Sequence, residues 1–218
     1  MNTRWDRLAP LLGVGFLVLL VISFAIGGNE PQGGASAAKV LSWYGSHRSR
    51  VQAAAYLLVA TVAVAFFFYG YLRDRLAGGS PGLAATAFGG VILFAVGGTI
   101  GAGMQLALAE HSSRLGSGAA LALSELFLYG NWIALNAGTA VLLLAFGIAI
   151  LRAGRLPAWT GWLAVGFGLL SVVPVYGIDP IPVAVWTLVI SVVLFRRESR
   201  AAVAGRSGVA QPAATTAG

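Results

Sequence analysis

The chain has 218 residues, of which 58% are hydrophobic and 10% are charged, and its formal net charge is +7. Soluble domains carry roughly 25% charged residues, and a soluble fold of this size buries only about 70% of the surface that its unfolded chain exposes. The composition therefore excludes a water-soluble domain and makes lipid the solvent for most of the chain. Cysteine is absent, which excludes disulfides, thiolate catalysis and cysteine-ligated metals.

The apolar residues form six long runs that predict an all-α transmembrane bundle. A helix that crosses ~30 Å of hydrocarbon needs about 20 mainly apolar residues, and a single helix satisfies its own backbone polar groups in lipid. The predicted spans cover residues 9–27, 52–72, 82–108, 132–151 (with a second candidate start at 119), 158–176 and 180–195. We expect one membrane domain over residues 1–198 and a disordered cytoplasmic tail over residues 199–218, which are rich in Ala, Gly, Ser and Thr.

The basic residues predict the orientation of these spans. With the N-terminus in the cytoplasm, ten of the 14 basic residues fall in cytoplasmic segments and four in outer ones, which agrees with the positive-inside rule. Six spans then place the C-terminus in the cytoplasm as well. A nucleic-acid partner is not predicted, because it would need these bases gathered on one face. The predicted partner is the lipid bilayer of a bacterial cell membrane, whose anionic cytoplasmic leaflet attracts the positive charge.

The loop between the first two spans contains a helical pattern of its own. Ala37, Val40, Leu41 and Tyr44 recur at positions i, i+3, i+4 and i+7, which is the apolar stripe of an amphipathic helix. We expect a short helix here that lies on the outer surface or packs over the bundle.

Three spans carry pairs of small residues at i, i+4 spacing, which let helix backbones approach closely in lipid. The pairs are Gly97 and Gly101, Ala134 and Gly138, and Ala164 and Gly168. Packing within one chain is the first interpretation, and association of copies into a homo-oligomer through the same faces is the second.

Polar residues gather at the outer ends of the spans, and we call this set the outer polar layer. It comprises His47, Arg48, Arg50, Glu110, His111, Glu125, Asn131 and Asp179. Imidazole and carboxylate groups suit zinc and iron, and histidine titrates near neutral pH, so one hypothesis is an outer metal or ligand site. The alternative is an ordinary polar surface in which Arg48 and Arg50 pair with neighbouring acids.

Two further segments carry a resemblance to a known group. Residues 42–50, which enter the second span, read SWYGSHRSR, and residues 151–162, which enter the fifth, read LRAGRLPAWTGW. Both resemble a family of actinobacterial multi-pass membrane proteins of unknown function. The resemblance implies a six-span architecture and brings no activity, cofactor or catalytic residue with it.

The sequence predicts a non-enzymatic integral membrane protein with a structural, regulatory or accessory role. No catalytic, cofactor or phosphate-binding motif is present, such as Gly-x-Ser-x-Gly or His-Glu-x-x-His. One alternative is a small-molecule transporter, which requires a continuous polar cavity at mid-membrane reached by Gln105 and Asn136. Another is a membrane enzyme or metal site, which requires His47, Glu110, His111 and Glu125 to converge. Asn136 is otherwise expected to hydrogen-bond to a neighbouring helix.

Overall fold

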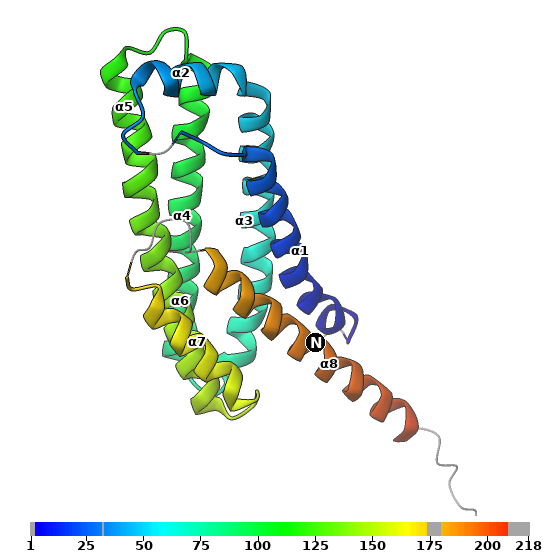
Figure 1. Cartoon of the computed structure of the whole chain (residues 1–218). Helices are drawn as coiled ribbons and strands as arrows, with labels where there is room; N and C mark the ends of the chain where they lie inside the picture. The colour runs from blue at the N-terminus through cyan, green and yellow to red at the C-terminus, as the bar shows by residue number, and fades with distance from the viewer. Residues whose placement is uncertain (1–2, 32, 174–179, 209–218) are drawn as a thin grey trace, which may run out of the picture.

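The computed structural model describes residues 3–31, 33–173 and 180–208, and these form helices joined by short connections, with no strand among them (Figure 1). The prediction of an all-helical bundle is therefore confirmed for this part of the chain. The helices are α1 (Thr3–Gly27), α2 (Ala37–Ser46), α3 (Arg48–Ala77), α4 (Pro81–His111), α5 (Ser117–Glu125), the π-helix η1 (Leu126–Asn131), α6 (Trp132–Ala153), α7 (Ala158–Leu170) and α8 (Pro180–Gly208).

Five stretches of helix within the described residues are long and apolar enough to cross a membrane. They are 8–27, 48–77, 81–111, 117–153 and 180–200. Large apolar side chains point outward along them: Val21, Val59 and Ile133 are all more than half exposed. Such an exterior is stable only against an apolar solvent, so the fold is that of a helical membrane protein.

The fourth predicted span differs from the structure at its start and in its regularity. Helix begins at Ser117 and continues through α5, η1 and α6 to Ala153, so the earlier of the two candidate starts is close to the observed one. The π-helical turns at residues 126–131 interrupt the α-helical register at the Gly130-Asn131 pair. A π-bulge of this kind changes which side chains face the neighbouring helix, and such bulges are frequent at functional sites.

The last two predicted spans also differ from the observed helices. Helix α7 has 13 residues, which cover about 20 Å at 1.5 Å per residue, too little to cross ~30 Å of hydrocarbon alone. Residues 174–176 of the predicted fifth span lie outside the described residues. Helix α8 continues to Gly208, beyond residue 199, where a disordered tail was expected. Alanines at 201, 202 and 204 favour helix, and Glu198 binds Arg75 of α3 at 2.8 Å.

Helix α1 packs against α3, α3 against α4, α4 against α6 and α6 against α7, and α8 returns to pack against α1 (Figure 1). The closest approach is between α4 and α6. A Cβ atom added to Gly90 would lie 2.5 Å from the backbone nitrogen of Leu142 and 2.9 Å from the carbonyl oxygen of Gly138. The two backbones therefore touch where neither helix carries a side chain, as small residues permit in lipid.

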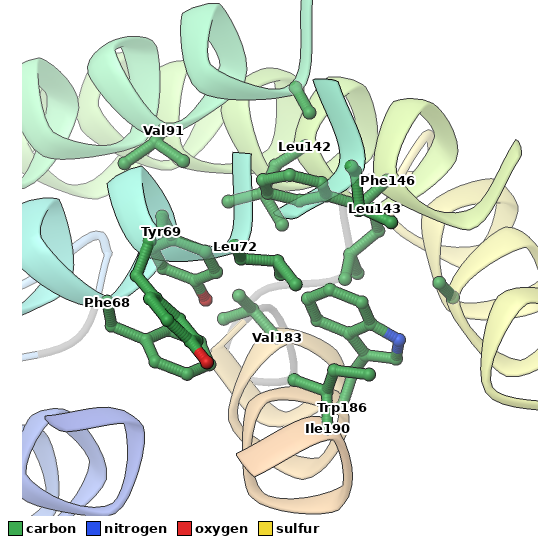
Figure 2. Close-up of a cluster of buried hydrophobic side chains, with 14 of the residues drawn as sticks. Phe68, Tyr69, Leu72, Val91, Leu142, Leu143, Phe146, Val183, Trp186 and Ile190 are labelled. Atoms are coloured by element: carbon green, nitrogen blue, oxygen red, sulfur yellow. The ribbon is translucent and has the colours of Figure 1, made fainter. Parts of the chain in front are cut away.

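The main core joins α3, α6 and α8 through an aromatic column. Figure 2 shows the rings of Tyr69, Phe146 and Trp186 inside this core. The Tyr69 and Phe146 rings stack with centroids 6.0 Å apart, and the Phe146 and Trp186 rings with centroids 5.9 Å apart. Their polar atoms are satisfied: the Tyr69 and Thr187 hydroxyls lie 2.7 Å apart, and Trp186 Nε1 donates to the Thr160 carbonyl at 3.1 Å. The column thus fixes α8 against the bundle without leaving a buried donor unpaired.

A short helix, α2, occupies the segment for which the sequence predicts one. It lies across one end of the bundle, over the ends of α3, α4 and α5 (Figure 1), and we call this end the α2 end. Ser36 caps it by accepting a hydrogen bond from the Lys39 backbone N–H at 3.4 Å. Val40 and Tyr44 are buried on its inner face, in one cluster with Leu108 of α4. The apolar stripe thus faces the bundle, as the packed-over alternative requires.

Candidate functional site

A cavity of about 120 Å³ lies between the helices and extends from Glu30, beside α2, to Phe16 and Ala65 near the middle of α1 and α3. Side chains from α1, α3, α4, η1 and α6 line it, and most of them are apolar, such as Phe24, Leu58, Ala95 and Leu135. Polar groups line it as well, among them Glu30, Gln105 and Asn131. A concave, mostly apolar pocket with a few polar groups is the usual form of a small-molecule site.

Glu30 reaches the cavity from the connection that follows α1. Gly28 turns the chain there with a φ of +78°, a backbone conformation that favours glycine, and the guanidinium of Arg50 lies beside it. The Glu30 carboxylate then accepts two hydrogen bonds, from the Gln105 amide of α4 and from the Tyr44 hydroxyl of α2, the latter at 3.3 Å. Three separate segments therefore fix the position of one acidic side chain.

Burial changes the acidity of this side chain. Removal from water raises the pKa of Glu30 from 4.5 to about 7, and the hydrogen bonds from Tyr44 and Gln105 offset only part of this effect. No ion pair to Glu30 occurs within the residues that the structure describes. The guanidinium of Arg50 lies near Gly28, but its Nε donates to the carbonyl oxygen of Ile26 at 3.2 Å. The carboxyl is therefore close to half-ionised at neutral pH, with no cationic partner in the described part of the chain.

Asn131 is the second polar residue of the cavity that the fold holds in an unusual position. It ends the π-helix η1, is 7% exposed, and packs over Gly101 of α4, where an added Cβ would lie 2.5 Å from Asn131 Nδ2. Its side-chain oxygen is buried and accepts no hydrogen bond in the described structure. A buried acceptor without a donor costs free energy, so this oxygen is a polar group that the described packing leaves unsatisfied, enclosed by its neighbours rather than exposed to the cavity.

The outer polar layer splits into separate local interactions. Arg48 and Glu110 form an ion pair, and Gln52 also donates a hydrogen bond to Glu110. Arg50 bonds instead to the backbone of α1, as described above. Of the two arginines that were expected to pair with acids, Arg48 does so, and Arg50 has no acidic partner among the described residues.

The other members of the layer have surroundings of their own. The His47 ring stacks on Trp43, with centroids 4.7 Å apart, and its Nδ1 lies 2.9 Å from the Trp43 carbonyl oxygen. His111 is exposed at the end of α4, Glu125 is half-buried at the end of α5, and Asp179 lies outside the described residues. Across residues 3–31, 33–173 and 180–208, no three His, Asp or Glu side chains are placed to hold a metal ion.

The Arg48–Glu110 ion pair is expected to contribute little to stability. The Arg48 side chain is 56% exposed, and water and salt screen exposed pairs strongly. We expect Glu110→Gln to leave the midpoint of unfolding in mixed micelles unchanged within error, both at 0.1 M and at 1 M salt. A large fall in the midpoint that disappears at high salt would contradict this expectation and show a dominant role for the pair.

The predicted packing residues lie at two helix interfaces. Gly97 and Ala134 face each other between α4 and α6, where a Cβ added to Gly97 would lie 3.0 Å from that of Ala134, and Gly138 opposes Gly90. Ala164 is fully buried, and Gly168 abuts Leu144, between α6 and α7. Gly101 differs, because Asn131 rather than a helix backbone occupies the space above it.

Glu30 and Tyr44 are absent from the residues that the sequence singles out as a site. Glu30 stands in a polar loop beside glycines and a proline, where an acidic residue is ordinary. The available signal was Gln105, a lone amide in an apolar span, because a buried amide needs a partner. The sequence alone could not identify Glu30 as that partner, because it does not show where the loop after α1 runs.

Comparisons with family models, with curated proteins and with solved structures give no significant match to this chain. The resemblance to actinobacterial multi-pass proteins therefore stays a prediction. The class of protein follows from the fold alone, as an all-helical membrane protein with an inter-helix cavity.

Proposed function

We propose that this chain is a non-enzymatic protein of the cell membrane that holds a small, mainly apolar molecule in the cavity between its helices. The observation that carries the proposal is the cavity itself, with about 120 Å³ of space and mostly apolar walls. A dry engineered cavity of about 150 Å³ binds benzene, so the space suits one ring or a short alkyl chain. A regulatory or accessory role fits such a site, because ligand binding would stabilise one arrangement of the helices.

We also propose six membrane segments with both termini in the cytoplasm, among which α7 is too short to cross by itself. The distribution of arginines supports this orientation, and so does the end of α8. Arg197 donates to the carbonyl oxygen of Arg155 before α7, and Glu198 binds Arg75 near the end of α3. The charged part of α8 thus lies at the end of the bundle opposite α2. If the C-terminal end of α3 lies in the cytoplasm, the C-terminal end of α8 lies there as well. This conclusion does not depend on how deep in the membrane α7 connects to α8.

The two alternative functions have less support. A transport path needs polar groups through the middle of the membrane, but Asn136 donates to the Trp132 carbonyl of its own helix at 2.9 Å rather than to another helix. It is also not among the residues that line the cavity. An enzyme at the outer polar layer needs its acids and histidines together, whereas Glu110 pairs with Arg48 and His47 stacks on Trp43.

Filling the cavity tests the proposed function. Gly98 lines it, and a Cβ added there would make ordinary contacts of 3.9 Å with Leu58 and Leu135, so Gly98→Leu should fit and occupy the space. Gly103 lies on the same helix with nothing within 4 Å of an added Cβ, which makes Gly103→Leu the matched control. Ligand that binds only the folded state raises stability by RT ln(1 + [L]/Kd).

The measurement is the thermal midpoint of the purified protein in lipid-free nonionic detergent, with and without n-hexanol. We expect hexanol to raise the midpoint of the wild type and of Gly103→Leu, and to leave that of Gly98→Leu unchanged. Micelle effects of the alcohol are common to all three proteins and cancel. An equal response of the three would show that the cavity takes no ligand, and the proposed function would fail.

A further inference from the structure

We infer that the natural occupant of this cavity is a small lipophilic amine, whose apolar body fills the space between the helices and whose ammonium group donates a hydrogen bond to Glu30. This inference rests on the proposed function and names the class of ligand for the same site. The polar groups of the cavity, their positions and their charge each support it.

The polar lining of the cavity offers hydrogen-bond acceptors. A carboxylate has about four lone-pair sites, and the Glu30 carboxylate uses two of them, for Gln105 and Tyr44. The remaining sites can accept from a ligand, so the ligand that fits them is a donor, and an ammonium group carries up to three donors and no acceptor.

Glu30 lies beside the apolar part of the cavity. Its carboxylate bonds to Gln105 of α4, and the cavity walls beyond it include Leu58 of α3 and Ala95 of α4. An ammonium group that donates to Glu30 can therefore extend its carbon chain along these apolar walls.

Charge favours a cation over an acid or a neutral molecule. Among the described residues, the charged or titratable groups near Glu30 are the hydroxyl of Tyr44, which donates to it, and Arg50, which is bound to the Ile26 carbonyl. Neither neutralises the carboxylate by an ion pair. A buried carboxylate gains most from a charged donor, whereas a second acid would meet like-charge repulsion.

The experiment compares three probes of one chain length in lipid-free detergent: n-hexylamine, n-hexanol and hexanoate. At pH 8 we expect hexylamine to bind the wild type about tenfold more tightly than hexanol, and hexanoate not to bind measurably. Affinities come from the concentration dependence of the thermal midpoint. Equal affinities for the amine and the alcohol would overturn the inference but leave the proposed function intact. No binding by any probe would overturn both.

Glu30→Gln assigns the preference to one side chain. The glutamine keeps an oxygen for Gln105 and Tyr44 but loses the charge, so we expect the amine and the alcohol to bind it equally. Glu110→Gln removes the same charge from an acid that is paired outside the cavity, and should keep the tenfold preference. A preference that survives in Glu30→Gln would overturn the inference.

Wild-type protein alone provides a second measurement if the variant does not fold. An alkylamine has a pKa near that of lysine, about 10.4, and is cationic from pH 5 to pH 8, while the Glu30 carboxyl ionises within this range. We expect the affinity for hexylamine to rise with pH over this range and that for hexanol to stay constant. An amine affinity that does not depend on pH would contradict a carboxylate partner.

The ammonium group could belong to a free amine or to the headgroup of a membrane lipid. Nanodiscs of phosphatidylcholine, which has no N–H donor, with and without added phosphatidylethanolamine distinguish these sources. A hexylamine response that weakens when phosphatidylethanolamine is added identifies the lipid as a competitor. A response that stays the same identifies a free amine as the ligand.

Discussion

Gly90→Ala should destabilise the protein by about 3 kcal/mol, at the upper end of the usual cost of overpacking a core. The added methyl group would lie 2.5 Å from the backbone nitrogen of Leu142 and 2.9 Å from its Cα. These are backbone atoms and cannot rotate away, so the two helices must separate along their length. Separation costs the dispersion contacts that hold helices together in lipid, where burial from water gives no driving force.

The neighbouring residue provides the control. Gly89 is exposed on the same helix with nothing within 4 Å of an added Cβ, and alanine in a helix is favoured over glycine by about 0.5–1 kcal/mol. Gly89→Ala should therefore be neutral or slightly stabilising. Free energies of unfolding from SDS titration in mixed micelles check both variants. Equal effects at the two positions would show that α4 and α6 do not touch as described.

Glu30 should make the stability of the protein fall as the pH rises, which is the reverse of what a paired acid does. Its pKa is 4.5 in an exposed state and about 7 in the folded state. The folded protein therefore binds this proton more tightly than the unfolded chain. The stabilisation is fully present below pH 4.5 and is lost as the pH rises through about 7.

The size of this effect follows from 1.36 kcal/mol per pKa unit, which gives about 3 kcal/mol in all and about 2–3 kcal/mol between pH 5 and pH 8. Glu30→Gln should remove most of this dependence and be the more stable protein at pH 8. Free energies of unfolding of the two proteins at pH 5 and pH 8, without ligand, give the difference that belongs to Glu30. Parallel pH profiles for the wild type and the variant would show that Glu30 is solvated rather than buried.

Part of the candidate site could be predicted from the sequence and part could not. The polar residues of the spans were visible, including Gln105 and Asn131, and so was the helix that Val40 and Tyr44 anchor. The contact between Glu30 and Gln105 could not be predicted from the sequence, because it joins residues 75 apart through an irregular loop. The π-helix that turns Asn131 toward α4 also has no periodic pattern by which the sequence could predict it.

The sequence by itself determined the helical membrane class, because long apolar runs can satisfy their backbone groups in lipid only as helices. It also determined the amphipathic stripe of α2, because 3.6-residue periodicity is a local property. Only the tertiary structure decided which small residues meet at an interface, that α7 is short, and that Glu30 reaches a cavity. These depend on how helices rotate and cross, and that choice is made by packing between residues distant in the chain.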